Sequence, residues 1–223
     1  MNEISYSSTG ARVGFPPIEV VKRKPTKSRK TGRVYSTLEE NCLEHEMLPS
    51  LAYGRKGCSL KWKREPQDSH VAKWLPAKLT WHAGMRVRKA IGYDAGPKDS
   101  KRAWNLKSDK RYEYIYPLRE WGWDREKCIE VIRAAGLPVP VKSACFFCPA
   151  MKPHELEELH RDHPEYGARI IEIERRAAPN LKRVEGLWIR STKGKRGAQP
   201  KPGSMTVFLR MLPSSPCASD CDA

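Results

Sequence analysis

The sequence lacks the features of a membrane-inserted or secreted protein. No apolar run approaches the roughly 20 residues that a helix needs to span a bilayer. The chain begins Met-Asn-Glu-Ile-Ser-Tyr-Ser-Ser, which is not the basic and then apolar start of a secretory signal. We therefore predict a soluble, cytoplasmic protein. Thiols stay reduced in that compartment, so the seven cysteines favour metal ligation or catalysis over a disulfide framework.

Two phosphate-binding glycine motifs are also missing, Gly-x-x-x-x-Gly-Lys-Ser/Thr and Gly-x-Gly-x-x-Gly. Acidic residues are outnumbered: 26 Asp and Glu stand against 42 Lys and Arg, which gives a formal net charge of +16. Such a charge attracts nucleic acid or phosphorylated small molecules, the alternative being a solvated basic surface that serves only solubility. Basic residues concentrate in residues 22–33, expected to form a mobile loop or arm, and in residues 193–203, expected to form a linker.

Local patterns predict both helices and strands. Thr37 and Glu40 form a capping-box pattern that opens a helix before Pro49, and Asp124 is a suitable N-cap for a helix that ends at Gly136. Two further helices are expected to begin at Pro153 and Pro164. Strand-like stretches lie at 15–21, 88–94, 112–118 and 188–189, and a loop at 95–100 is expected to present Lys101 and Arg102.

Cys145 and Cys148 are the most informative residues in the chain. Two cysteines spaced i and i+3 around a turn bring their sulfurs together, and a metal held there needs two further ligands to complete a tetrahedron. Cys58, in a basic loop, and Cys128, on the apolar face of its helix, are the best donors. A redox dithiol and two packed thiols are the alternatives. An all-sulfur site selects zinc or an iron–sulfur cluster, and the proline after Cys148 favours the cluster.

Other candidate residues are set aside. Cys42 lies mid-helix and is expected to be a packed thiol, and Cys217 and Cys221 fall in a polar tail. The pair His154 and His160 lacks the i, i+4 spacing of zinc proteases. Three tryptophans near the basic clusters have the chemistry to stack on a base, although core packing is the more usual role of this residue: Trp62, Trp104 and Trp121.

Several segments together resemble the phage and bacterial branch of the phosphoadenosine phosphosulfate reductase family, relatives of the ATP pyrophosphatases. They are Gly14–Val20, Leu48–Gly54 with Cys58–Lys63, Ala90–Asp94 ahead of Arg102, Tyr116–Trp121, and Lys142–Pro149. The resemblance covers about residues 14–155. It implies an α/β fold with a central parallel sheet flanked by helices, an adenine nucleotide or sulfonucleotide substrate, and chemistry at sulfur assisted by cysteines.

The sequence departs from that family at its start. The family binds phosphate with an N-terminal Ser-Gly-Gly-x-Asp-Ser loop, for which Ser7-Ser-Thr-Gly10 is a poor substitute. The missing unit would also remove a strand, so the expected fold is an N-terminally truncated α/β domain with a partial parallel sheet and a cysteine-rich, helical C-terminal part. A separate chain that supplies the loop, a late start codon, or loss of nucleotide hydrolysis would each explain the departure.

The expected layout has a disordered start at 1–13, one reductase-like domain at 14–192 with a basic loop at 22–36, and a basic linker and flexible tail at 193–223. The leading hypothesis is an enzyme or subunit of sulfur or nucleotide chemistry. In it Lys61, Lys63 and Arg102 bind the anionic part of the substrate, while zinc or a 4Fe-4S cluster is held by four cysteines, Cys58, Cys128, Cys145 and Cys148. The rival hypothesis is a metal-stapled nucleic-acid-binding protein without nucleotide turnover.

Overall fold

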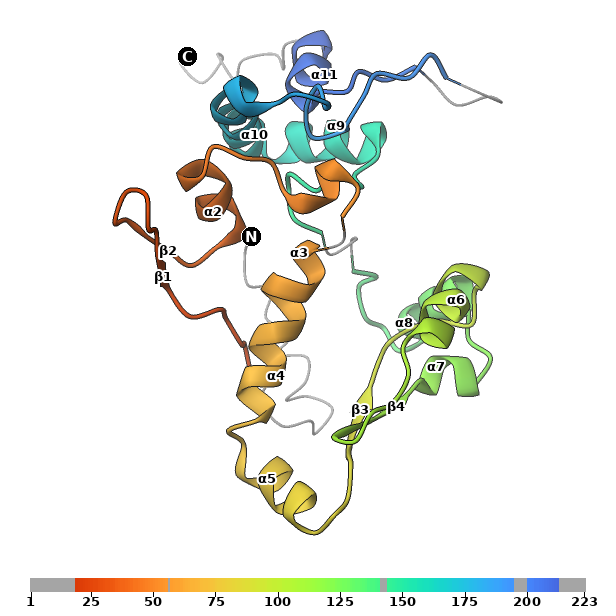
Figure 1. Cartoon of the computed structure of the whole chain (residues 1–223). Helices are drawn as coiled ribbons and strands as arrows, with labels where there is room; N and C mark the ends of the chain where they lie inside the picture. Colours follow the sequence, from red (N-terminus) through yellow and green to blue (C-terminus); the bar gives the residue numbers. More distant parts are fainter. Residues whose placement is uncertain (1–18, 56, 141–143, 195–199, 213–223) are drawn as a thin grey trace, which may run out of the picture. The chain divides into compact units, whose positions relative to one another are not determined.

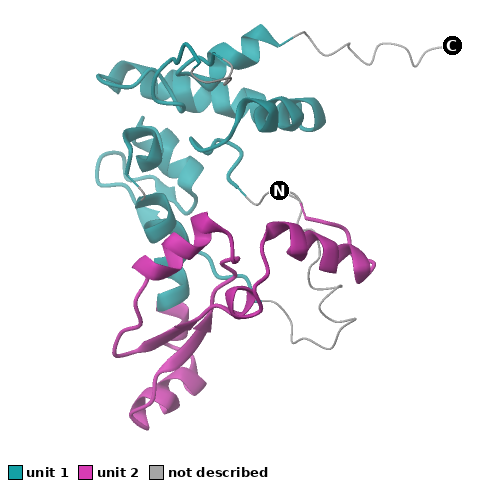
Figure 2. Ribbon diagram, turned by 90° about the vertical axis from the view of Figure 1, so that its right-hand side faces the viewer, with its two compact units in different colours: residues 1–68, 144–223 teal, residues 69–143 magenta. Residues whose placement is uncertain are grey.

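The structure is a computed structural model that describes residues 19–55, 57–140, 144–194 and 200–212. The chain divides into two compact units, drawn in different colours in Figure 2. Unit 1 comprises Met1–Asp68 and Ala144–Ala223, and unit 2 is the intervening segment Ser69–Ser143. Within the described ranges, no helix is both long enough and apolar enough to cross a membrane.

Unit 1 begins with a small hairpin where the sequence predicted a mobile basic arm. Strands β1 (Thr26–Lys27) and β2 (Val34–Tyr35) pair antiparallel, and the backbone N–H of Ser28 donates to the carbonyl oxygen of Arg33 at 2.7 Å. Arg23 attaches the segment to a helix by donating to the carbonyl oxygen of Lys61, at 3.1 Å. The basic side chains thus project from an ordered turn. The segment is ordered because its backbone N–H and C=O groups pair with one another, which the charge pattern alone does not indicate.

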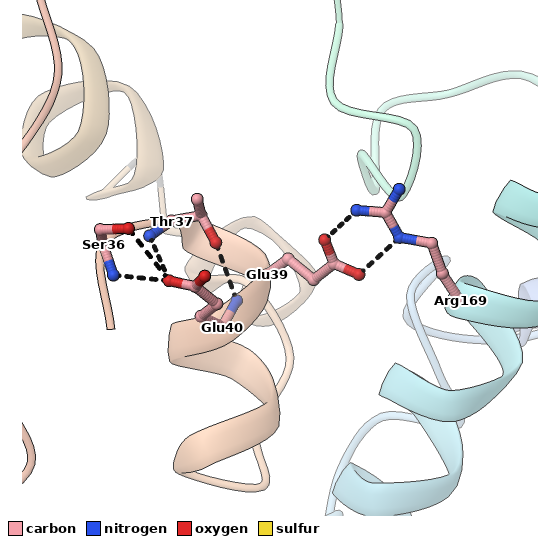
Figure 3. A network of polar contacts seen from close by, with 5 residues as sticks. All are labelled: Ser36, Thr37, Glu39, Glu40 and Arg169. Carbon is pink, nitrogen blue, oxygen red and sulfur yellow. Dashed lines mark hydrogen bonds and ion pairs between the residues drawn. The ribbon is translucent and has the colours of Figure 1, made fainter. Parts of the chain in front are cut away.

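Helix α2 (Leu38–Glu44) begins at the predicted capping box. The Thr37 hydroxyl accepts from the backbone N–H of Glu40, and the Glu40 carboxylate accepts in return from the backbone of Thr37 and Ser36 (Figure 3). A short series of helical turns follows: η1 (Ser50–Tyr53), α3 (Gly57–Ser59), the π-helical turn η2 (Leu60–Arg64) and α4 (Glu65–Val71). Their order along the chain can be followed in Figure 1.

The second part of unit 1 is helical, as predicted. Helices α9 (Pro153–Asp162) and α10 (Pro164–Ala177) each begin at a proline, whose fixed φ suits the first helical position. Leu156, Ile170 and Ile173 are fully buried in a core that also receives Cys42 and Leu48 from the first part of the chain. The expected tail contains a further helix, α11 (Met205–Met211), because Met205 and Leu209 are buried in the same core. A 3-10 turn, η3 (Ala178–Asn180), follows α10.

A buried carboxylate on α10 fixes this C-terminal part. Glu174 accepts from the backbone N–H groups of Leu187 (2.7 Å), Met205 (3.0 Å) and Thr206 (2.8 Å), and from the Ser204 hydroxyl (2.6 Å). Gly186 passes so close that a Cβ there would lie 2.7 Å from the Cα of Ser204. Trp188 is buried beside it in a turn, so the strand predicted at 188–189 is wrong.

Unit 2 contains the parallel pairing that the fold prediction required, as a small two-stranded sheet flanked by helices. Strands β3 (Val87–Ala90) and β4 (Tyr112–Ile115) pair in register from Val87 opposite Tyr112. The helices are α5 (Leu75–His82), α6 (Pro97–Asn105), α7 (Pro117–Glu120) and α8 (Arg125–Ala134). Residues 97–100 of the predicted loop are thus helical, and Lys101 and Arg102 follow them on helix α6. Most of the strand predicted at 15–21, and the start predicted at 1–13, lie outside the described residues.

Candidate thiol site

The Cys-x-x-Cys segment forms two successive tight turns in unit 1. The backbone N–H of Cys148 donates to the carbonyl oxygen of Cys145 at 3.0 Å, and the N–H of Met151 donates to the carbonyl oxygen of Cys148 at 2.8 Å. Phe147, between the two cysteines, is only 3% exposed and anchors the segment in the core. The aromatic residue buries the turn, while both cysteines stay partly accessible at its edge.

Cys58 belongs to the same unit and lies on α3, just before η2. Its Sγ is 3.1 Å from the hydroxyl oxygen of Ser50. The π-helical turn that follows carries two of the predicted phosphate-binding residues, Lys61 and Lys63. Lys63 is exposed and lies close enough to Cys145 to favour its thiolate. The structure therefore brings one of the predicted anion-binding lysines close to the predicted thiol site.

Burial is the main influence on the thiols of this unit. It raises the pKa of Cys145, and the neighbouring Cys148 and Cys58 raise it further, while Lys63 lowers it. The pKa of Cys42 rises to about 12, first because of burial and then because of Cys58 and Cys145. Ionising one thiol thus opposes ionisation of the next. A soft cation would relieve this cost, because it binds thiolates and displaces their protons.

Cys42 is the packed thiol that the sequence predicted, with 2% of its surface exposed. Its position adds something that the sequence did not indicate. Cys145 packs against the same hydrophobic core, and Cys42 is electrostatically coupled to both Cys58 and Cys145. Four cysteines of the described residues thus belong to unit 1: Cys42, Cys58, Cys145 and Cys148.

The other two predicted site residues are in unit 2. Cys128 lies on α8, where burial, Asp94 and Asp124 raise the pKa of its thiol. The Asp124 side chain caps this helix as predicted, by accepting from the N–H of Lys127 at 2.8 Å. Arg102 forms an ion pair with Asp99 on its own helix at 2.7 Å. Their participation in the site stays a prediction, and Cys217 and Cys221 lie outside the described residues.

Arg169 is a residue of this region that the sequence did not single out. From α10, its guanidinium forms a two-point ion pair with the carboxylate of Glu39 on α2 (Figure 3). The same guanidinium lies 4.4 Å from the ring centroid of Phe146 and 5.3 Å from that of Tyr166. Phe146 stacks in turn on Tyr166, with 4.9 Å between centroids. Arg169 thereby links Phe146, the residue after Cys145, to helices α10 and α2. It stacks on Phe146 from α10 and forms its ion pair with Glu39 on α2.

Comparison of the chain with protein-family models, with curated proteins and with solved structures gives no match. Across the described ranges, no group of three or more histidine, cysteine, aspartate or glutamate side chains has the arrangement of a metal site. The donor chemistry nevertheless suits a thiophilic metal, because the side chains that gather in unit 1 are thiols with one lysine beside them. The residues present therefore fit zinc or an iron–sulfur cluster by ligand type.

Proposed function

We propose that the chain is an enzyme, or an enzyme subunit, of sulfur or nucleotide chemistry that resembles phosphoadenosine phosphosulfate reductases. Its chemical centre would be the thiol site of unit 1. The observation that carries the proposal is that Cys58 and Cys148 lie near enough to Cys145 to raise the pKa of its thiol, while the ammonium group of Lys63 lowers that pKa. Core thiols packed only for volume do not require a nearby cation, whereas thiolates do.

In this proposal Cys58, Cys145 and Cys148 hold zinc or an iron–sulfur cluster. Such a group supplies either a structural link between the turn and α3 or, for a cluster, electrons for chemistry at sulfur. The protein's own contribution is to hold the thiols and to place positive charge nearby. Lys61 and Lys63 would attract the anionic part of an adenine nucleotide or sulfonucleotide, and Arg102 remains a predicted third contact.

Two cysteines are candidates for the fourth ligand. The sequence favours Cys128, which lies in unit 2, whereas Cys42 lies in unit 1 and is coupled to Cys58 and Cys145. Cys128 stays the ligand that the sequence predicts, and Cys42 is almost fully buried among apolar side chains. Replacing each cysteine separately distinguishes the two, since only the true ligand changes the bound metal.

The test is metal analysis and an absorption spectrum of anaerobically purified full-length protein. We expect bound iron with a broad visible band, or bound zinc without colour, and we expect Cys145→Ser and Cys128→Ser to lose the metal. Cys42→Ala is the matched control and should retain it. Metal-free protein, together with a Cys145→Ser variant of unchanged fold and colour, would show that the metal assignment is wrong.

Nucleotide turnover is a separate measurement. The printed sequence contains no Ser-Gly-Gly-x-Asp-Ser loop, so hydrolysis or reduction of adenine nucleotides is assayed with and without a separately expressed chain that carries one. Recovery of turnover only in the mixture supports a split enzyme. A metal-loaded protein that shows no turnover in any mixture would contradict the enzymatic part of the proposal and leave the thiol site intact.

A further inference from the structure

The most exposed tryptophan described in the structure is Trp104, on helix α6 of unit 2. Its side chain is 81% exposed. Tryptophan is highly buried on average, because its ring carries the largest apolar surface of any side chain. Among the described residues, ring stacks or cation–π contacts involve five tryptophans but not Trp104 or Trp74: Trp62, Trp81, Trp121, Trp123 and Trp188. Trp81, for comparison, contacts Tyr112 and Arg111 and donates its indole N–H to the carbonyl oxygen of Arg111.

The helix beneath this exposed ring is firmly held within unit 2. Ala103, which directly precedes Trp104 on α6, is buried with 5% of its surface exposed. The Tyr116 hydroxyl donates to the carbonyl oxygen of Leu106 at 3.1 Å, which fixes the end of the helix to the segment after β4. The Trp104 ring is thus presented by a supported helix and does not belong to a frayed end.

The surroundings of Trp104 are strongly basic. Lys101 precedes it by three residues, the spacing at which side chains are neighbours on a helix surface, and is itself exposed. Between Pro97 and Arg111 the acidic residues are Asp99 and Asp109, against six basic ones: Lys98, Lys101, Arg102, Lys107, Lys110 and Arg111. Asp99 is paired with Arg102 on α6, so the remaining charge of the segment that carries Trp104 is positive.

We propose that Trp104 and Lys101 form a binding site for single-stranded nucleic acid, in which the indole stacks on a base and the lysine contacts the phosphate backbone. An uncovered aromatic ring beside cations is the combination that single-strand-binding surfaces use. A duplex is excluded as the preferred ligand, because its bases are already stacked on one another. The site belongs to unit 2, whereas the thiol centre belongs to unit 1.

The experiment measures binding of full-length protein to a fluorescein-labelled thymidine 12-mer by fluorescence anisotropy at low salt. Trp104→Ala should weaken binding roughly tenfold or more, within the range of one lost base stack, while Trp104→Phe should keep most of the affinity. Lys101→Gln should lower the slope of log affinity against log salt by roughly 0.7, the value for one phosphate contact to a single strand. Trp121→Ala is the matched control, because Trp121 is 60% exposed in the same unit and packs against Trp123.

Three results with the labelled 12-mer would overturn the proposal. They are an unchanged affinity of Trp104→Ala, an equal loss in Trp121→Ala, and binding to the 12-mer no tighter than to a duplex of the same length. Competition by adenosine monophosphate at concentrations that match the 12-mer would instead assign the ring to a mononucleotide, and would also overturn it. Cys145→Ser should leave the affinity for the 12-mer unchanged. The proposal for the thiol site and the proposal for Trp104 can therefore fail separately.

Discussion

Replacing Glu174 by glutamine should destabilise unit 1 more than any other single polar substitution considered for this protein. The two carboxylate oxygens accept four hydrogen bonds from neutral donors, three of them backbone N–H groups. Glutamine has nearly the same shape, but its amide nitrogen donates and does not accept. The substitution therefore keeps the volume and removes acceptor capacity from the centre of the C-terminal part.

The magnitude depends on which way the new amide turns. With the nitrogen in place of Oε1, the buried N–H groups of Leu187 and Met205 both lose their acceptor. With the nitrogen in place of Oε2, it is able to donate to the Ser204 hydroxyl, and Thr206 alone loses its partner. The second arrangement costs less. Hydrogen bonds to charged groups contribute about 1.5–3 kcal/mol each, so we expect a loss of about 2–4 kcal/mol.

Thermal unfolding followed by circular dichroism measures this loss. For a chain of this size it corresponds to a fall in Tm of roughly 5–15 °C. Glu172→Gln is the control, since Glu172 lies on the same helix but is an exposed partner of Arg175 and Arg176. A change in Tm below about 1 °C for Glu174→Gln, or an equal fall in the control, would refute the role given to the buried carboxylate.

Three further predictions concern the region around the thiols. Arg169→Ala should lower the free energy of unfolding by about 1–2 kcal/mol and speed iodoacetamide alkylation of Cys145. Arg169→Lys keeps the charge but not the stacking, so its alkylation rate should lie between those of the wild type and Arg169→Ala. Equal rates in the wild type and both variants would contradict this prediction. Because burial raises the pKa of Cys42 to about 12 from an ordinary 9.0, the free energy of unfolding should fall as pH rises from 9 to 12. The Cys42 thiol accounts for about 4 kcal/mol of this loss in urea unfolding, and Cys42→Ala should remove that contribution. Thr37→Ala should cost about 1 kcal/mol by removing the α2 cap, with no effect on metal content.

Local signals in the sequence predicted local structure well. The capping box at Thr37, the N-cap at Asp124 and the helix starts at Pro153 and Pro164 are all confirmed, because each depends on groups within a few residues of one another. The strand predicted at 188–189 failed for the opposite reason. Trp188 is buried against Phe208 of α11, whereas Ile189 is exposed and has a positive φ of 73°, which no strand adopts.

Long-range partners were harder to predict. Glu174 did leave a signal, since it falls between Ile173 and Ala177 within the apolar stripe of its helix, where an acidic residue must find buried donors. Arg169 left none, because its partners Glu39 and Phe146 come from distant segments. The cysteine site was predictable only in part. Spacing paired Cys145 with Cys148, but the approach of Cys42 and Cys58 depends on packing between two separated parts of the chain.

The division of unit 1 into two stretches has a consequence for how the protein is made. Cys42 and Leu48 complete their core only with residues that follow the Ser69–Ser143 segment. At about 5–20 residues per second, ribosomes need on the order of 4–15 s to synthesise that segment. During this interval the emerging N-terminal stretch exposes apolar surface and the Cys42 thiol to solvent or to chaperones. Unit 2, continuous in sequence, is free to fold first.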